Sequence, residues 1–434
     1  MDNARRTAVL ALVHQEQNGY SNLVLASALE KQSLSARDKA FVSALFYGVT
    51  ERLLTLDWRL QKCLSKPLKK LDPEVRAILR SGLYQAVYME IPAAAAVNES
   101  VALCRGLRKS SAAGLVNAVL RKAMEQDPTK AGFANRAQRL SVLYSVSRPV
   151  VDLFLKQYPE QTERILQAFF ETPTVYLRCN TLKNTPEELC RRLESEGAKA
   201  EIGPLPGSVI AQFKGGPART KAFEEGLYHV QGYASQLAAL SLGAKPGESV
   251  LDLCAAPGGK TLLLAQQMQN KGKLLSCDAA PNRLPLIQTA LERCGVTCAE
   301  VLENDASVYQ PNFGEFDRVL ADAPCSGLGI IAKKPDIRYK TMQGVEELHA
   351  LQLEILKTAS RYVKKGGKLV YSTCTIDRRE NQEIVTAFLA EHPDFRLVPA
   401  FVVPQGAIQD GEMLTLLPGY CGSDGFFIAT MERV

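Results

Sequence analysis

Two cysteines in the last third of the chain have the surroundings that chemistry most often requires. Cys325 lies in Asp322-Ala323-Pro324-Cys325-Ser326-Gly327, and Cys374 lies in Ser372-Thr373-Cys374-Thr375. Each follows a candidate strand and has small polar neighbours, which is typical of a sheet edge where substrates bind; most other cysteines are expected to be small buried hydrophobic residues. A thiolate can add to carbon 6 of an electron-poor pyrimidine and make carbon 5 nucleophilic toward a methyl sulfonium. One thiolate and one base then suffice to complete the cycle.

A turn of small residues lies upstream of these cysteines and predicts a cofactor site. The run is Leu251-Asp252-Leu253-Cys254-Ala255-Ala256-Pro257-Gly258-Gly259-Lys260-Thr261, which reads as a strand, a turn and the start of a helix. Gly258 and Gly259 allow a ligand to approach the backbone closely. A Walker A loop requires a glycine where Cys254 stands, and the dinucleotide pattern G-x-G-x-x-G is absent. The turn therefore favours a nucleoside-like ligand over these two phosphate-binding loops.

Acidic residues follow the next two candidate strands. Asp278 stands 19 residues after Gly259, where an acid usually binds ribose hydroxyls. Asp305 follows the third strand and is placed to accept a hydrogen bond from an adenine amine. Either residue alone would be read as an ordinary acid at a strand end. Their recurrence after successive strands favours a nucleoside site for the set.

The elements that must position these residues alternate between strand and helix from Lys245 onward. Strands are predicted over 249–253, 274–278, 298–302, 318–321 and 368–372, and helices over 260–268, 283–293, 345–362 and 380–389. This alternation predicts a doubly wound α/β, Rossmann-like domain over 245–434.

The first half of the chain has a different pattern. Apolar residues at three- and four-residue spacings predict helices from Arg5 to Ala123, which would form a helical bundle domain over 1–140. An apparent linker over 127–147 spans the end of this domain. Two helices and a small α+β segment should complete a middle domain over 141–244, with strands at 175–179 and 227–231 and a capped helix from Thr185. A length of 434 residues suits three domains.

Composition and charge narrow the class of protein. Residues 1–140 hold 21 Lys and Arg against 12 Asp and Glu, a net of +9, whereas the remainder holds 31 against 34, a net of −3. This asymmetry indicates a nucleic-acid-binding module, with an idle basic helical surface as the alternative. The 11 cysteines contain no C-x-x-C pair and the four histidines are scattered, so neither disulfides nor a metal site is expected. No run is as long as a membrane span and no signal peptide begins the chain, so we expect a cytoplasmic protein without a membrane partner.

Three stretches of the sequence resemble motifs of the Sun/Fmu-type RNA cytosine-5 methyltransferases. They are LDLCAAPGGKT (251–261), FDRVLADAPCSG (316–327) and YSTCT (371–375), and the likeness extends to 334–337, 380–381 and 424–427. The helical first domain resembles the NusB-type RNA-binding fold. The likeness covers essentially the whole chain. It implies a NusB-like bundle joined to a class I methyltransferase domain, S-adenosylmethionine as methyl donor, and ribosomal RNA of the small subunit (16S) as substrate, methylated by a monomer.

The resemblance also implies roles for single residues. Cys374 would be the nucleophile, Cys325 would assist proton removal and product release, and Asp322 would steady the cytosine or the methionine end of the cofactor. The implied cofactor-binding residues are Cys254, Ala255, Ala256, Pro257, Gly258, Gly259, Lys260, Asp278, Arg283, Asp305 and Asp322. The residues themselves leave either cysteine free to attack, and in DNA cytosine methyltransferases the Pro-Cys cysteine does so. One departure is Gly232 after Gln231, where the family often has Asp.

Two other functions compete with this interpretation. A DNA cytosine-5 methyltransferase would share the chemistry, but the basic helical domain and the presence of Cys374 beside Cys325 argue against it. A non-enzymatic RNA-binding or antitermination factor would need only the first domain. In such a protein Cys325, Cys374 and Asp322 would be surplus.

Overall fold

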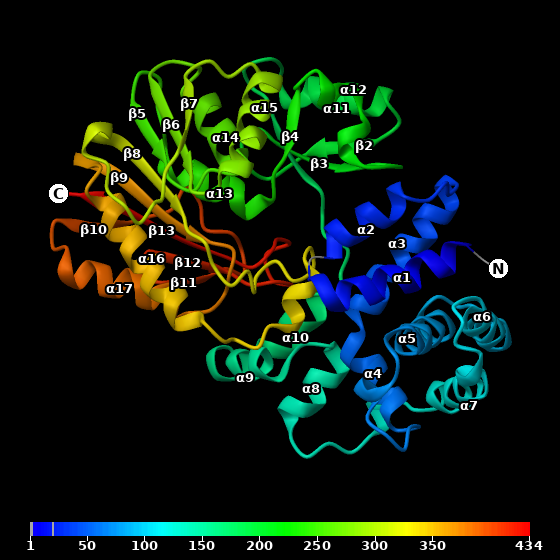
Figure 1. The fold of residues 1–434 in the computed structure, drawn as a ribbon. Helices are drawn as coiled ribbons and strands as arrows, with labels where there is room; N and C mark the ends of the chain where they lie inside the picture. Colours follow the sequence, from blue (N-terminus) through cyan, green and yellow to red (C-terminus); the bar gives the residue numbers. More distant parts are fainter. Residues whose placement is uncertain (1–2, 20) are drawn as a thin grey trace. The chain divides into compact units, whose positions relative to one another are not determined.

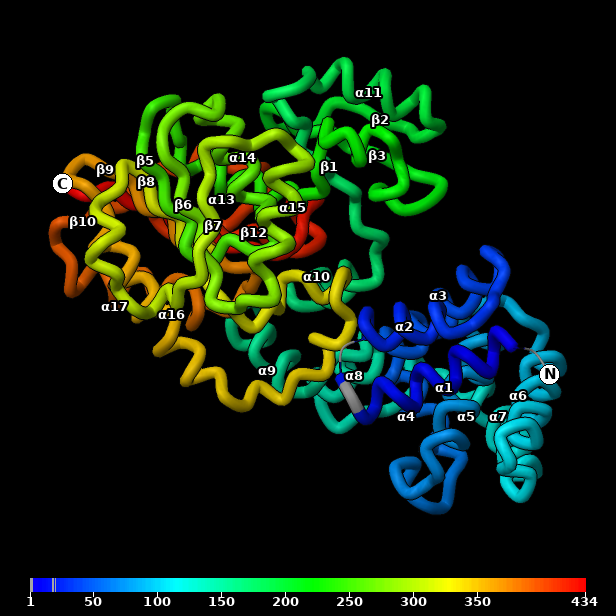
Figure 2. The backbone as a smooth tube through the Cα atoms, turned by 45° about the horizontal axis from the view of Figure 1, so that its top comes forward, coloured from blue at the N-terminus to red at the C-terminus, as the bar shows by residue number. Residues whose placement is uncertain are grey.

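A computed structural model describes residues 3–19 and 21–434, and these residues form two compact units (Figures 1 and 2). The first unit takes in the chain up to Phe170 together with Lys333–Met342. The second unit takes in Glu171–Ala332 and Gln343–Val434. The chain therefore enters the helical unit a second time, through a ten-residue segment far along the sequence.

The first unit is helical, as its sequence pattern predicts. Its core holds side chains such as Phe46 from α3, Leu60 from α4, Ile78 from α5 and Leu120 from α7, each with no exposed surface. The helices are α1 (Asn3–Asn18), α2 (Ser21–Glu30), α3 (Ala36–Glu51), α4 (Leu53–Gln61), α5 (Pro73–Tyr88), α6 (Ala93–Gly106), α7 (Ala113–Met124), α8 (Arg136–Tyr144), α9 (Arg148–Gln157) and α10 (Thr162–Ala168).

The expectation of a linker over 127–147 is wrong, because helix α8 lies within it. Asn135 caps this helix by accepting a hydrogen bond from the backbone N–H of Gln138, at 2.9 Å. Leu140 is fully buried, and the Thr55 hydroxyl donates to the carbonyl of Val142 at 2.6 Å. A helix of nine residues is too short to be stable alone, and these tertiary contacts stabilise it.

The segment Lys333–Met342 is anchored in the helical unit by polar side chains. Asp336 accepts hydrogen bonds from the Gln15 amide at 2.8 Å and from the Ser21 hydroxyl at 2.5 Å. Arg338 has no exposed surface and donates to the carbonyls of Tyr144 and Phe169. The Lys334-Pro335-Asp336-Ile337 motif thus lies in the helical unit, and its contacts there are structural.

The second unit begins with a four-stranded antiparallel sheet in the order β2-β3-β1-β4. Its elements are β1 (Tyr176–Cys179), β2 (Lys199–Ile202), β3 (Ser208–Gln212), β4 (Tyr228–Val230), α11 (Pro186–Ser195) and α12 (Lys221–Glu224). Thr185 and Glu188 form the capping box that starts α11, as the sequence predicts. The sequence analysis does not predict strands β2 and β3, which are short at four and five residues, and β2 is largely exposed.

A nine-stranded mixed sheet forms the centre of the second unit, in the order β11-β12-β13-β9-β8-β5-β6-β7 with β10 beside β13. The parallel strands are β5 (Ser249–Asp252), β6 (Lys273–Asp278), β7 (Ala299–Glu303), β8 (Phe316–Asp322) and β9 (Val363–Thr373). The antiparallel additions are β10 (Phe395–Val398), β11 (Ile408–Asp410), β12 (Met413–Leu416) and β13 (Phe426–Arg433). The predicted Rossmann-like sheet is confirmed, and it is wider than the five predicted strands.

Helices cover both faces of this sheet (Figure 1). On one face, α13 (Tyr233–Leu242) and α14 (Gly259–Gln267) pack on side chains such as Val250 and Leu320. On the other, α16 (Val345–Ser360) and α17 (Gln382–Glu391) pack on side chains such as Leu251 and Val319. Neighbouring residues along a strand point to opposite faces, which explains why near-continuous apolar runs suit these strands. Helix α15 (Leu284–Cys294) follows β6.

The order of the strands places a ligand crevice. Strands β5 and β8 are parallel neighbours, and the chain leaves them toward opposite edges of the sheet. Ligands of doubly wound sheets bind outside the carboxyl ends of the strands at this reversal. Those ends are Asp252 and Asp322, each of which opens a loop that the sequence had marked as functional.

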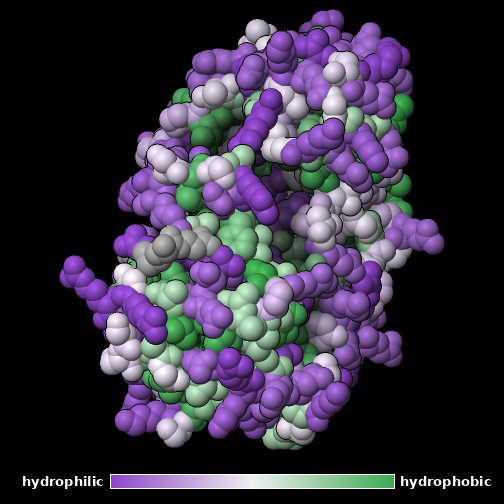
Figure 3. Space-filling view, turned by 90° about the vertical axis from the view of Figure 1, so that its right-hand side faces the viewer, coloured by the Kyte–Doolittle hydropathy of each residue, from purple (hydrophilic) through white to green (hydrophobic). Residues whose placement is uncertain are grey.

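The surface is mainly polar on the face shown in Figure 3, where hydrophobic side chains form small separate areas. Among the described residues, no helix combines the length and the apolar character needed to cross a membrane. Large apolar side chains that are exposed include Leu23 and Ile202, which are far apart in the sequence, and the consecutive residues 401–403. Most of the apolar content therefore serves the two cores.

Candidate active site

The structure brings the two predicted cysteines together. Cys325 lies in the loop after β8, and Cys374 follows the last residue of β9. These strands are parallel neighbours in which Asp322 pairs with Ser372, so their carboxyl ends lie side by side. The two Sγ atoms are 3.2 Å apart, and both side chains are partly buried. One small substrate atom can therefore be reached by both thiols.

The two thiols have different electrostatic surroundings. The hydrogen bond to Cys374, together with burial, raises the pKa of the Cys325 thiol well above its ordinary value. Cys374 is close enough to the Lys260 ammonium to interact with it electrostatically. A positive charge beside a thiol favours the thiolate.

Asp322 holds Lys260 in this position. Its Oδ2 accepts from Lys260 Nζ at 2.6 Å, and its Oδ1 accepts from the Ser372 hydroxyl at 2.6 Å. Burial by itself would lower the pKa of Lys260, but the Asp322 carboxylate outweighs burial and raises it. Lys260 is therefore charged, with its ammonium 5.6 Å from the centre of the Phe426 ring. Asp322, Lys260 and Cys374 form one electrostatic group.

The loop of residues 254–260, here called the cradle, is held in a fixed backbone conformation. Ala255 donates to the Cys277 carbonyl at 2.8 Å, which ties the loop to β6, and helix α14 begins at Gly259. Gly258 has a φ of +101°, and a Cβ there would lie 3.3 Å from Cα of Ile287. A glycine is therefore required at this position. Burial raises the pKa of the Cys254 thiol, which disfavours its thiolate form.

Asp278 and Arg283 close the cradle on the β6 side. The Asp278 carboxylate accepts from the backbone N–H groups of Ala256 and Ala280, each at 3.1 Å. Arg283 lies 3.5 Å from the same carboxylate and donates to the Ala256 carbonyl at 2.8 Å. The side chain of Asp278 is 6% exposed. The carboxylate is thus fixed in direction before any ligand arrives.

Asp305 differs from the other predicted cofactor residues. It is exposed, and its Oδ1 accepts from the backbone N–H and the hydroxyl of Ser307 at 2.9 and 2.7 Å. This is the hydrogen bonding of an aspartate that caps a turn. Contact between Asp305 and a cofactor stays a prediction.

Asp252 has no assigned role in the sequence interpretation, although it stands inside the quoted motif. It is fully buried, and its Oδ2 accepts from the Thr261 hydroxyl at 2.8 Å. Its Oδ1 is buried without a protein partner. Burial raises its pKa to about 7. The sequence could have pointed to Asp252, because it is an aspartate at the end of an otherwise apolar strand.

These features fit a ligand that combines a ribose with a charged amino-acid end. Asp278 can accept hydrogen bonds from ribose hydroxyls, and the glycine cradle gives close access to the backbone. Asp252 has an unpartnered buried oxygen, and Lys260 and Asp322 offer one charge of each sign. S-adenosylmethionine has both parts, so the residues present suit it.

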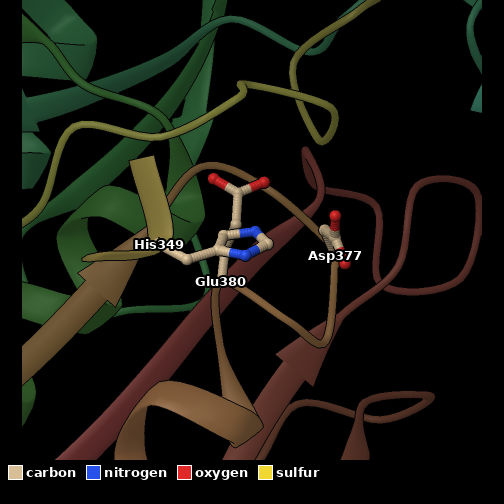
Figure 4. Close-up of side chains that lie close together, drawn as sticks. All are labelled: His349, Asp377 and Glu380. Carbon is tan, nitrogen blue, oxygen red and sulfur yellow. The ribbon is translucent and has the colours of Figure 1, made fainter. Parts of the chain in front are cut away.

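A cluster near the cysteines has the composition of a metal site. Ligand atoms of His349, Asp377 and Glu380 lie within 4.8 Å of one another, and the two carboxyl groups point in different directions around the imidazole (Figure 4). Asp377 is already paired with the Arg379 guanidinium at 2.6 Å, and Glu380 accepts three hydrogen bonds, two from Ser326 and one from Gln352. Both carboxylates are thus engaged within the protein. The cluster gives no argument for an ion.

The Asp424-Gly425-Phe426-Phe427 motif supports the loop that carries Cys325. Gly425 donates to the Gly329 carbonyl at 2.8 Å, and a Cβ on Gly329 would lie 2.0 Å from the Gly425 carbonyl oxygen. The two backbones are in contact, so glycine is required.

At the family's Gln-Asp position, this chain has Gln231 and Gly232. Gly232 is the N-cap residue of α13 and offers no capping side chain, and the Gln231 amide donates to the Ser235 hydroxyl at 3.3 Å.

Comparison with known proteins gives matches along the whole chain. The family described as 16S rRNA methyltransferase RsmB/F matches residues 239–432, the NusB family matches 2–125, and a ferredoxin-like domain of RsmF/B-like methyltransferases matches 150–211. The probable ribosomal RNA small subunit methyltransferase B of Bacillus subtilis is 38% identical, with 99% of each chain covered. The protein of the same name from Synechocystis is 33% identical over both full chains. The crystal structure of PH0851 matches with a TM-score of 0.84 and 28% identity, covering 99% of this chain and 98% of that one.

Proposed function

Because the chain belongs to the RsmB/F family of 16S rRNA methyltransferases, we propose that it methylates carbon 5 of a cytosine in small-subunit ribosomal RNA. The methyl donor would be S-adenosylmethionine. The observation that carries this proposal is the pair of cysteine Sγ atoms 3.2 Å apart, beside the Lys260–Asp322 ion pair. An enzyme with this substrate would work in the cytoplasm, and we expect a monomer.

The cysteines would divide the chemistry between them. Cys374 Sγ adds to carbon 6 of the cytosine, which makes carbon 5 nucleophilic. S-adenosylmethionine, when bound, supplies the methyl group from its sulfonium. Cys325 then helps to transfer the proton on carbon 5 to solvent, the electron pair of that C–H bond re-forms the double bond between carbons 5 and 6, and Cys374 leaves carbon 6 as a thiolate. The target base must leave its stack for both thiols to reach it.

Two features of the site support Cys374 as the nucleophile. The hydrogen bond to Cys374 and burial raise the pKa of the Cys325 thiol, which disfavours a thiolate at Cys325. Lys260 gives Cys374 a nearby positive charge, and Asp322 keeps that charge in place. The residues that would hold the cofactor are the 254–260 backbone, Asp278, Arg283 and Asp322, with Asp305 at the rim.

The helical unit supports an RNA substrate through its exposed lysines. Lys66, Lys69 and Lys70 are all exposed and lie between α4 and α5. Replacing these three with Ala should weaken RNA binding and flatten its dependence on salt, because each phosphate contact contributes about 0.7–0.9 to the slope of log K against log salt. The matched control replaces three exposed lysines of the second unit, Lys245, Lys271 and Lys273. Equal salt slopes for both triple variants would contradict a role of Lys66, Lys69 and Lys70 in RNA binding.

The proposed function is tested by the product of the reaction. Purified protein is incubated with tritiated S-adenosylmethionine and, separately, with small-subunit rRNA and duplex DNA, and labelled nucleosides are identified after digestion. We expect label in 5-methylcytidine from RNA and none from DNA. Label in 5-methyldeoxycytidine would favour the DNA enzyme, and RNA binding without any label would favour the non-enzymatic factor. Bisulfite sequencing of rRNA from a deletion strain then identifies the cytosine.

A further inference from the structure

Glu380 lies behind the two cysteines and is completely buried. Its Oε2 accepts from the backbone N–H of Ser326 at 2.8 Å and from the Gln352 amide at 2.9 Å. Its Oε1 accepts from the Ser326 hydroxyl and lies 3.3 Å from the Thr375 hydroxyl. Ser326 follows Cys325 and Thr375 follows Cys374 in the sequence. A single carboxylate therefore touches the next residue after each thiol.

The hydroxyl protons define the direction of this network. The Ser326 and Thr375 oxygens are 2.8 Å apart, and each hydroxyl has one proton to donate. The Ser326 proton goes to Glu380, so the Thr375 proton goes to Ser326. The Thr375 oxygen in turn accepts from the backbone N–H of Asp377 at 3.2 Å. The chain of bonds ends at Glu380, which serves only as an acceptor.

Both sides of each cysteine are tied to the same cluster. Gln352 also donates to the carbonyl of Pro324 at 2.9 Å, so the residues before and after Cys325 are both held. Asn381 accepts from the Thr373 hydroxyl at 2.6 Å and donates to the Thr375 carbonyl at 3.0 Å, which does the same for Cys374. These side chains are almost completely buried. Only the Gln352 Oε1 atom of these side chains is buried without a partner, and buried hydrogen-bonded networks of this kind rigidify a site.

We propose that Glu380 is a positioning residue that sets the distance between Cys325 and Cys374. Glu380 bonds to the residues beside the thiols and takes no proton from the substrate. This inference rests on the proposed function, because a fixed distance between the two thiols matters only if both act on one base. Without the carboxylate, the Cys325 loop would move away from the end of β9, and both addition to the base and release of the product would slow.

Kinetics of two variants test this proposal. Glu380→Ala should lower kcat about 100-fold, the usual effect of displacing reacting groups by about 1 Å, and leave the KM for S-adenosylmethionine unchanged. Glu380→Gln should keep kcat within about tenfold of wild type, because the Ser326 hydroxyl can turn and accept from the new amide. Loss of all activity in Glu380→Gln would assign the carboxylate a proton-transfer role and overturn the proposal.

A matched control separates positioning from stability. Asp317 is also held by three hydrogen-bond donors, but it lies at the amino end of β8. Asp317→Ala should lower the melting temperature and leave kcat unchanged. If Glu380→Ala fails to fold, Ser326→Ala removes the same bond from the loop side. The double variant Ser326→Ala with Glu380→Gln should then be no slower than Ser326→Ala alone, since both act through one contact. Additive losses in that double variant would overturn the proposal.

A measurement without RNA reports the thiol geometry directly. Diamide accepts the two thiol hydrogens and leaves a Cys325–Cys374 disulfide, which peptide mass spectrometry can follow over time. Wild type, Glu380→Gln and Asp317→Ala should form it at similar rates, and Glu380→Ala several-fold more slowly. Equal rates in Glu380→Ala would overturn the positioning role. If the rate depends on Glu380 but wild type makes no 5-methylcytidine, the proposed function fails and the positioning of the thiols stands.

Discussion

Strand β8 has an aspartate near each end, and the two carboxylates have almost the same partners. Near its start, Asp317 accepts from Lys364 at 2.9 Å and from the Ser249 hydroxyl at 2.7 Å. At its end, Asp322 accepts from Lys260 at 2.6 Å and from the Ser372 hydroxyl at 2.6 Å. An aspartate bonded to a lysine and a serine thus occurs at both ends of the same strand.

The two groups differ in what their lysines face. Lys364 is 42% exposed and donates also to the Ser249 hydroxyl, so the group at the start joins β5, β8 and β9. Lys260 is 12% exposed and lies within electrostatic reach of Cys374. We therefore expect the same types of side chain to stabilise the fold at one end and to serve the proposed site at the other. What distinguishes them is the end of the strand, because ligands bind at carboxyl ends.

The largest expected effect comes from the cysteines at the carboxyl end. Cys374→Ala should abolish methyl transfer and form no adduct with RNA, because the attacking thiolate is gone. Cys325→Ala should still allow attack and methylation but stall release, so that protein and RNA migrate together on a denaturing gel. Buried Cys277, below the site in β6, gives the matched control, and Cys277→Ala should turn over normally.

The opposite result would reverse the roles. If Cys374→Ala traps RNA and Cys325→Ala is simply inactive, Cys325 attacks, as in the DNA enzymes. Near-normal turnover in either variant would show that the corresponding cysteine is only packed.

The two aspartates of β8 give the next prediction. Asp322→Asn should lower kcat about 100-fold, because Lys260 loses the carboxylate that raises its pKa and holds it beside Cys374. Asp317→Asn should leave kcat at the wild-type value. Steady-state methyl transfer to rRNA at pH 7 measures both. Equal losses in the two variants would mean that the end of the strand does not decide the role.

The sequence predicted the elements of the parallel sheet well because buried strands and capped helices have strong local patterns. The predicted strand 274–278 corresponds to β6, and the predicted helix 283–293 corresponds to α15. The last strands were not predicted; β10 and β11 have only four and three residues, and β10 pairs with β13, which comes much later in the sequence. Helix α8 was taken for a linker because proline residues near both ends suggested irregular structure.

The site was predicted in part for a similar reason. Motifs mark residues that follow strands, so Cys325 and Cys374 could be selected, and the order of strands then places them together. The family likeness marked residues 380–381, but the sequence could not reveal that they support the cysteines. Gln352 comes from a distant helix, and its hydrogen bond to Glu380 depends on tertiary packing alone. The structural partner of Asp336 likewise lies 315 residues away.

A smaller effect is expected at the cofactor cradle. Asp278→Ala should weaken S-adenosylmethionine binding by about 1.5–3 kcal/mol for each lost bond to a ribose hydroxyl. Asp305→Ala is the control, because its carboxylate already caps a turn, and its loss should change affinity much less. Isothermal titration calorimetry measures both affinities. Unchanged affinity in Asp278→Ala would contradict the ribose contact, and a loss in Asp305→Ala as large as that expected for Asp278→Ala would show that Asp305 also binds the cofactor.

The smallest effect concerns stability at the amino end. Burial opposes ionisation of Asp317, but hydrogen bonds from Ser249 and Lys364 prevail and lower its pKa to about 2. A carboxyl group with a lowered pKa in the folded state stabilises the protein above the unfolded pKa of about 3.9, and this contribution is lost as pH falls toward about 2. Asp317→Asn should therefore lower the free energy of unfolding by about 1 kcal/mol at pH 7. Urea unfolding at pH 7, 5 and 3.5 should show this difference constant at first and smaller at the lowest pH. Lys364→Met, which removes one partner of the same carboxylate, should show the same trend with a smaller difference, whereas a difference that stays constant to pH 3.5 would contradict the ionic origin.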